Sequence, residues 1–95
     1  MKILVVDDSA LERQRIEASL RAQGHLVLLA DNGFDGLELA TQETPDVILL
    51  DVMMPGIDGL ETARRIRSRQ NHWSPIIFIS ANTQPEDIAA AIAAG

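Results

Sequence analysis

Residues 46–59 read Asp-Val-Ile-Leu-Leu-Asp-Val-Met-Met-Pro-Gly-Ile-Asp-Gly, and this stretch decides the fold class. Its continuous apolar run, Val47 to Leu50, is typical of a strand that is buried on both faces of a parallel sheet. The Pro55-Gly56 turn then leads toward a helix that Asp58 is expected to cap. Three further runs of the same kind are Ile3 to Val6, His25 to Ala30 and Ile76 to Ile79. The sequence therefore predicts four buried strands with helix-length connections.

The segments between these runs have the apolar spacing of amphipathic helices. Ser9 and Glu12 predict a capping box for a first helix over about residues 10–23, and Gly24 predicts its left-handed C-cap. Pro85 predicts the first turn of a fourth helix. The positions expected to face the core are Ile16, Leu20, Leu37, Ala40, Leu60, Ala63, Ile66, Ile88 and Ile92. Strand and helix in alternation predict an α/β fold built from βαβ crossovers.

Composition excludes several classes of protein. Fourteen acidic and eight basic side chains give a net charge of −6, which argues against direct nucleic-acid binding and favours a cation or a basic protein as partner. The absence of cysteine excludes disulfides and Cys-ligated zinc. No signal peptide and no apolar run of membrane-spanning length is visible, so we expect a cytoplasmic location and no membrane partner. The basic run of the third helix is expected on its solvated face: Arg64, Arg65, Arg67 and Arg69.

Acidic side chains stand where two of the predicted strands end. Asp7 and Asp8 follow the first strand, Asp51 follows the third, and Ser80 follows the fourth. Parallel strands present these ends at one edge of the sheet, where ligands bind. One isolated Asp is more often a helix cap or a solvated acid, but three that converge repel one another unless a cation neutralises them. Oxygen ligands alone favour Mg²⁺, beside which the Asp51 carboxylate is a candidate nucleophile toward phosphorus.

The three stretches at residues 3–9 (Ile-Leu-Val-Val-Asp-Asp-Ser), 46–59 and 77–81 (Ile-Phe-Ile-Ser-Ala) resemble the receiver domain of two-component response regulators. The resemblance covers essentially the whole chain, in order and at the family's spacing. It implies a flavodoxin-like doubly wound parallel sheet of five βα units in the order 2-1-3-4-5. It also implies that Asp51 accepts a phosphoryl group from a sensor histidine kinase or a phosphotransfer domain.

The resemblance implies further roles for residues around the acids. Asp7, Asp8 and Asp51 would hold Mg²⁺ together with the backbone carbonyl of Met53. Ser80 would be the switch hydroxyl that turns toward the aspartyl phosphate. Ala81 would keep the pocket rim small, and the side chains of Met53 and Asn82 would tune the lifetime of the phosphate. The chain would then be a phosphorylation-controlled signalling module rather than an enzyme that turns over an external substrate.

The chain departs from the family pattern at its C-terminal end. The fifth strand and helix are missing, and with them the family lysine, since Lys2 is the only lysine. We therefore expect residues 1–95 to form a receiver domain that is incomplete at its C-terminus, with four βα units in the order 2-1-3-4. Self-association through the open edge of the fourth strand, or marginal folding, is expected. An effector domain, where the protein has one, would follow Gly95, and a stand-alone receiver is equally consistent with these residues. Mg²⁺ binding should survive this loss better than phosphorylation.

Other functions were weighed against the same residues. The main alternative is a phosphorylation-incompetent, receiver-like module that binds partner proteins. A metal-dependent phosphatase with an aspartyl nucleophile is disfavoured because Met53 stands where a second Asp is needed. A dinucleotide or flavin site is disfavoured because Asp7-Asp8-Ser9 replaces a Gly-rich turn. The remaining aromatic and imidazole side chains are given structural roles: Phe34 and Phe78 in or near the core, Trp73 against the end of the third helix, His25 and His72 at surface or turn positions.

Overall fold

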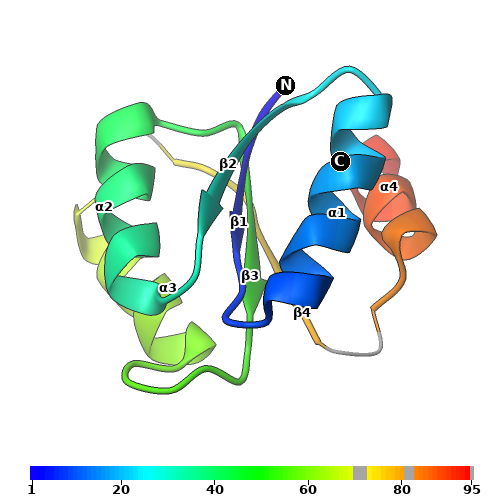
Figure 1. Cartoon of the computed structure of the whole chain (residues 1–95). Coiled ribbons are helices and arrows are strands. Elements are labelled where there is room, and N and C mark those ends of the chain that lie inside the picture. The colour runs from blue at the N-terminus through cyan, green and yellow to red at the C-terminus, as the bar shows by residue number, and fades with distance from the viewer. Residues whose placement is uncertain (70–72, 81–82, 95) are drawn as a thin grey trace.

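The computed structural model describes residues 1–69, 73–80 and 83–94, which form four strands and four helices in strict alternation (Figure 1). The elements are β1 (Lys2–Val6), α1 (Ala10–Ala22), β2 (Leu26–Ala30), α2 (Gly33–Glu43), β3 (Val47–Asp51), α3 (Gly59–Arg69), β4 (Ile76–Ile79) and α4 (Pro85–Ala94). The predicted strands agree with these bounds to within a residue. The continuous apolar runs were therefore a sufficient signal for the sheet.

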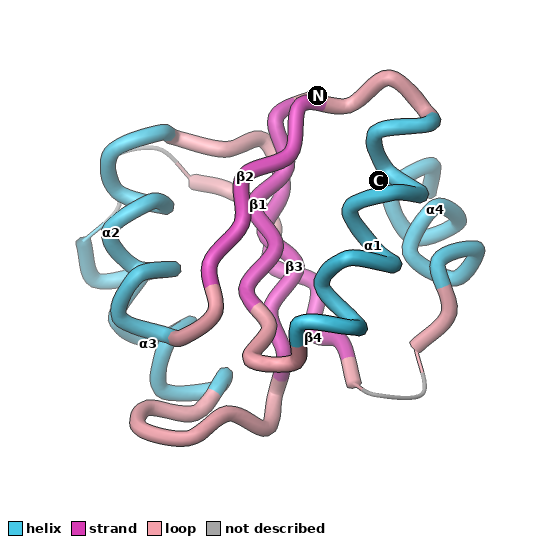
Figure 2. Tube along the Cα trace, in the orientation of Figure 1, coloured by secondary structure: helices cyan, strands magenta, loops and turns pink. Residues whose placement is uncertain are grey.

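The strands form one parallel sheet in the order β2-β1-β3-β4. Helices α1 and α4 cover one face of it, and α2 and α3 cover the other (Figures 1 and 2). Because helices lie on both faces, β1 and β3 read as uninterrupted apolar runs rather than alternating ones. The predicted flavodoxin-like doubly wound fold with strand order 2-1-3-4 is confirmed over the described residues.

The core has two halves, one on each side of the sheet. Side chains of β1 alternate between them: Ile3 and Val5 pack with Ile16 and Leu20 of α1, whereas Leu4 and Val6 pack under α2 and α3. All five residues of β3 are buried. Full burial of one such aliphatic side chain contributes about 1.5–3 kcal/mol to the free energy of folding. The two central strands are therefore firmly packed, and they fix the positions of the polar residues at their carboxyl ends.

Hydrogen bonds cap α1 at both of the ends that the sequence predicts. The Ser9 side chain accepts the Glu12 N–H at 3.3 Å, which confirms the N-cap. The reciprocal half of the capping box is wrong: the Ser9 N–H donates to Asp7 Oδ1 instead, at 2.9 Å. Gly24 has a φ of +89°, and the N–H groups of residues 24 and 25 donate to the carbonyls of residues 21 and 20. These bonds form the expected left-handed cap.

Helix α3 buries a different residue from the one that its spacing predicts. Leu60 is 56% exposed, whereas Thr62 is fully buried and its hydroxyl donates to the Asp58 carbonyl at 2.7 Å. The hydroxyl can be buried because this bond satisfies it. Asp58 also accepts the Glu61 N–H at 2.8 Å, as the predicted cap requires. The apolar spacing therefore located the helix but misplaced the edge of its buried face.

The prediction that both phenylalanines lie in or near the core is wrong. Phe34 is 52% exposed near the start of α2, where the Arg65 guanidinium lies 5.8 Å from the ring centroid. Phe78 is 44% exposed because β4 pairs, among the described strands, with β3 alone. Trp73 does contact the end of α3, since the Arg67 guanidinium lies 4.6 Å from its ring centroid.

Arginine side chains of α3 form ion pairs on the solvated face of this helix. Arg64 and Arg65 both pair with Glu61, and Arg69 pairs with Glu38, so the solvated face predicted for this run is confirmed. The half-buried His25 has its Nδ1 3.1 Å from the amino group of Met1, whereas His72 lies outside the described residues. In the part of the chain that the structure covers, no helix combines the length and the apolar character needed to cross a membrane.

Candidate functional site

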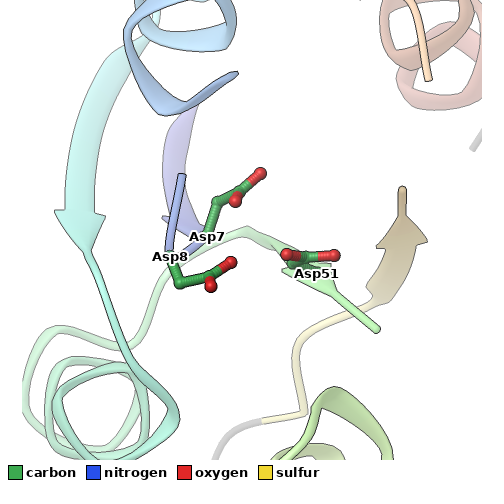
Figure 3. Close-up of side chains that lie close together, drawn as sticks. All are labelled: Asp7, Asp8 and Asp51. Atoms are coloured by element: carbon green, nitrogen blue, oxygen red, sulfur yellow. The ribbon is translucent and has the colours of Figure 1, made fainter. Parts of the chain in front are cut away.

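Three carboxylates meet at the carboxyl edge of the sheet. Val6 of β1 is in register with Leu50 of β3, so the residues that follow them, Asp7 and Asp51, leave neighbouring strands side by side. One carboxylate oxygen each of Asp7, Asp8 and Asp51 lies within 4.8 Å of the others. Figure 3 shows the Asp7 and Asp8 side chains extending toward the side on which Asp51 stands. Asp7 and Asp51 are buried, and Asp8 is exposed.

A cavity of about 490 Å³ opens beside these acids. Its lining comes from the ends of three strands and the first turn of α1: Asp7, Asp8, Ser9, Glu12, Asp51, Met53 and Ser80. The structure thus brings every predicted site residue to one cavity, except Ala81 and Asn82, which lie outside the described residues. Met53 is 78% exposed, and a ligand role for its backbone carbonyl stays a prediction.

Backbone hydrogen bonds hold the loop that carries Asp7. Its N–H donates to the Ala30 carbonyl of β2 at 3.1 Å. Its carbonyl accepts the Arg13 guanidinium at 2.7 Å, and its Oδ1 accepts the Ser9 N–H at 2.9 Å. The carboxylate therefore has a defined position before any ligand binds, which is the condition for a preorganised site.

Close packing of α3 holds the loop that carries Asp51. The Gly59 N–H donates to the Val52 carbonyl at 2.9 Å, and a Cβ at Gly59 would lie 2.2 Å from the Asp51 carbonyl oxygen. Only glycine permits this approach without a shift of backbone. Asp51 itself accepts the Met53 N–H on Oδ1 at 3.2 Å.

The environment of the cluster favours protonation or cation binding. Burial raises the pKa of Asp51 to about 6, and the negative charge of Asp7 adds to the effect. Burial also raises the pKa of Asp7, with the charges of Asp8 and Glu12 adding to it. Ionised carboxylates at this place repel one another and lack full hydration, so a cation is stabilised there. The donor set is oxygen only, as Mg²⁺ prefers, and the residues present therefore fit this ion.

Sequence reasoning missed two contributors to the site. Glu12 was assigned only a capping role, yet it lines the cavity; its position in the helical turn next to Asp8 was the available signal. Thr83 was not singled out, although its hydroxyl lies 3.4 Å from Ser80 Oγ. Nothing in the sequence indicates this pair, because it depends on how the chain turns after β4.

Comparison with known proteins agrees with this geometry. The family model described as the response regulator receiver domain matches residues 3–95. Protein PilH of Pseudomonas aeruginosa is 41% identical over 87 residues, which are 90% of this chain and 72% of PilH. The transcriptional regulatory protein AfsQ1 of Streptomyces coelicolor is 44% identical over 93 residues, which are 98% of this chain and 40% of AfsQ1. The chain thus spans less than half the length of this second relative.

The solved structures agree as well. A crystal structure of the receiver domain from the hybrid histidine kinase CckA superimposes with a TM-score of 0.88 at 27% identity, and the match covers 99% of this chain and 97% of that one. The sequence match spans the strands, the acids and the helices described above, and the structural match spans the same fold. The chain therefore belongs to the response regulator receiver domain family, whose members are signalling modules of two-component systems.

Proposed function

We propose that Asp51 accepts a phosphoryl group from the phosphohistidine of a sensor histidine kinase or phosphotransfer domain, in a Mg²⁺-dependent reaction. The single observation that carries this proposal is the buried pair Asp7 and Asp51, which share one cavity with the exposed Asp8. Such a pair is unfavourable without a cation and is suited to binding one. The membership of the chain in the receiver family supports the same reaction.

In this reaction a carboxylate oxygen of Asp51 attacks phosphorus, and an O–P bond forms as the N–P bond of the donor breaks. The bond electrons leave with the imidazole nitrogen, which then takes a proton. Asp51 must be ionised to attack, and its pKa of about 6 leaves it mostly ionised at neutral pH. The Met53 N–H steadies Oδ1 of the nucleophile. The phosphoryl group would then occupy the cavity in front of β3.

Mg²⁺ would be held by Asp7, Asp8 and Asp51, with the Met53 carbonyl as a further ligand. When bound, the ion supplies positive charge that neutralises phosphoryl oxygens. Asp7 contributes a carboxylate that the Ser9 N–H and the Arg13 contact already orient. Ser80, which lines the same cavity, would donate its hydroxyl to the phosphoryl group and so report phosphorylation to the segment before α4.

The proposed product is a change of conformation that controls an output, not a released metabolite. The same residues would assist hydrolysis of the aspartyl phosphate, which resets the module. We place this cycle in the cytoplasm, with the kinase as upstream partner and an effector domain as downstream partner. Such a module shifts a two-state equilibrium by the extra hydrogen bonds that the phosphoryl group makes in one state.

The experiment is intact mass after incubation with Mg²⁺ and a small-molecule phosphodonor. One adduct of about 80 Da, the mass of a phosphoryl group, should appear in the wild-type chain. The adduct should be absent from Asp51→Asn and from a sample that contains a chelator. The matched control is Asp58→Asn, which alters a nearby acid that caps α3 and does not line the cavity. Uptake of phosphate by Asp51→Asn would refute the acceptor assignment.

One observation favours the alternative of a phosphorylation-incompetent binding module. No basic side chain is among the described residues that line the cavity, and Lys2 donates instead to the Glu43 carbonyl at 2.9 Å. A cation beside the transferring group normally stabilises its charge. This module would bind a kinase with equal affinity before and after Asp51→Asn and would gain no phosphate. Two measurements on the wild-type chain and on Asp51→Asn separate the two functions: the mass measurement, and a titration that gives the affinity of each for the kinase.

A further inference from the structure

The segment after β4 contains a pair of hydroxyl groups at the cavity. The Ser80 N–H donates to Thr83 Oγ1 at 2.9 Å, and the Thr83 N–H donates to the Ser80 carbonyl at 2.9 Å. Ser80 Oγ lies 3.4 Å from Thr83 Oγ1. Thr83 therefore contacts both the backbone and the side chain of the residue that lines the cavity.

The separation of the two hydroxyl oxygens determines what this contact can do. Hydroxyl pairs normally stand about 2.7–2.8 Å apart, so a separation of 3.4 Å makes a weak, reversible interaction. Among the described residues, Ser80 Oγ has its hydrogen bond with this hydroxyl, although Ser80 lines the same cavity as the three clustered carboxylates. A hydroxyl has one proton to donate. Either hydroxyl can be the donor in this pair. In the arrangement in which Ser80 donates to Thr83, the Ser80 proton is withheld from a group in the cavity.

The residue after Thr83 forms hydrogen bonds with α1 and with α4. The next residue, Gln84, accepts the Arg15 guanidinium on Oε1 at 3.3 Å. The Arg15 guanidinium also donates to the Glu12 carboxylate at 3.1 Å, and Glu12 lines the same cavity as Ser80. The Gln84 N–H donates to Asp87 within the first turn of α4 at 3.3 Å. A movement of Thr83 would therefore displace Gln84 and the first turn of α4.

We infer that Thr83 is a positioning residue that holds the Ser80 hydroxyl out of the reacting position until a phosphoryl group competes for it. The inference rests on the proposed function of Asp51 and deepens it, because it names the group with which the phosphoryl oxygen competes. It also explains how phosphorylation would affect α4. Thr83 loses its contact with the Ser80 hydroxyl, and Thr83 directly precedes Gln84, which is hydrogen-bonded to the first turn of this helix.

The test compares the rate of Asp51 phosphorylation by a small-molecule phosphodonor at saturating Mg²⁺ in four proteins: wild type, Thr83→Val, Ser80→Ala and the double variant. Valine keeps the shape of threonine and removes the hydroxyl. We expect Thr83→Val to react about two- to fivefold faster than wild type, the factor expected for one weak hydrogen bond. Thr83→Ser, which keeps the hydroxyl, should react at the wild-type rate.

The double variant separates positioning from a purely structural role. If Thr83 acts through the Ser80 hydroxyl, Thr83→Val has no effect on the rate in the Ser80→Ala background. The Ser80 N–H bond to Thr83 does not need the serine side chain, so a turn-stabilising role would give the same change in both backgrounds. An unchanged rate for Thr83→Val, or an equal change in both backgrounds, would overturn the inference.

A second measurement does not depend on phosphorylation. The three-bond Hα–Hβ couplings of Ser80 report whether its side chain occupies one rotamer. They should indicate one preferred rotamer in wild type and in Thr83→Ser, and averaging in Thr83→Val. If no variant gains phosphate, the proposed function fails while these couplings still decide the positioning role. The couplings also test the positioning role of Thr83 if Ser80→Ala reacts too slowly for its rate to be measured. Unchanged Ser80 couplings in Thr83→Val would contradict that role.

Discussion

Replacement of Asp51 by asparagine tests the electrostatic description of the site without any phosphodonor. The substitution removes one negative charge from the cluster and keeps an Oδ1 that accepts the Met53 N–H, a bond of 3.2 Å in the wild-type protein. Asp51 is 8% exposed, so the amide occupies nearly the same buried space. We expect Asp51→Asn to be more stable than wild type in the absence of divalent cations near neutral pH.

The magnitude follows from the pKa of this carboxyl group, which rises from 3.8 to about 6 on folding because the group is buried next to Asp7. Each pKa unit corresponds to about 1.4 kcal/mol, so the ionised group destabilises the metal-free protein by about 3 kcal/mol. The folded state binds more protons than the unfolded state between these two values. Stability contributed by the protonated group is therefore present below 3.8 and is lost as the pH rises through about 6.

The assay is urea unfolding in a chelating buffer at about pH 7.5 and about pH 4. At the higher pH, Asp51→Asn should be more stable by about 2–3 kcal/mol, which is about 1–2 M in the urea midpoint. At the lower pH the two proteins should differ little, because the wild-type group is then protonated. Saturating Mg²⁺ should reduce or reverse the difference, since the wild-type protein binds the ion more tightly.

Glu86→Gln provides the matched control. It removes the same unit charge from an exposed position in the first turn of α4, so it should not reproduce the stabilisation expected of Asp51→Asn. A midpoint of Asp51→Asn at or below that of wild type at about pH 7.5 would refute the reasoning. A stability difference of the same size at both pH values would refute it equally, because burial of an ionised group then has no part in the effect.

Three further predictions concern metal binding, backbone packing and capping. Mg²⁺ affinity, measured by calorimetry, should fall about tenfold from about pH 7.5 to about pH 5, because protons compete for Asp51, whose pKa is about 6; a constant affinity would contradict the cluster as the site. Gly59→Ala should cost about 2 kcal/mol or more in thermal unfolding and weaken Mg²⁺ binding, because its Cβ would lie 2.2 Å from the Asp51 carbonyl oxygen, whereas exposed Ser68→Ala on the same helix should do neither. Ser9→Ala should cost about 1 kcal/mol in urea unfolding through loss of the cap on α1, and Ser9→Thr, which keeps a hydroxyl acceptor and adds no charge to the acidic cavity, should retain most of that stability.

The sequence alone determined the strands, most helix ends and the order of the acids along the chain. Each of these depends on residues that are close in sequence. A strand buried on both faces needs a continuous apolar run, and caps such as Ser9 and Asp58 act on N–H groups three residues away. The acids at the strand ends were equally visible, because parallel strands present the same end to the same edge.

Only the tertiary structure decided which side chains these elements bury and how the site is tuned. Phe34 and Leu60 fit apolar patterns yet stand exposed, whereas Thr62 is buried and satisfied by Asp58. The raised pKa of Asp51 requires burial by residues remote in sequence and a neighbour, Asp7, that follows another strand. Exposure, electrostatic repulsion and hydrogen-bond competition depend on contacts between distant segments, and those contacts exist only once the chain has folded.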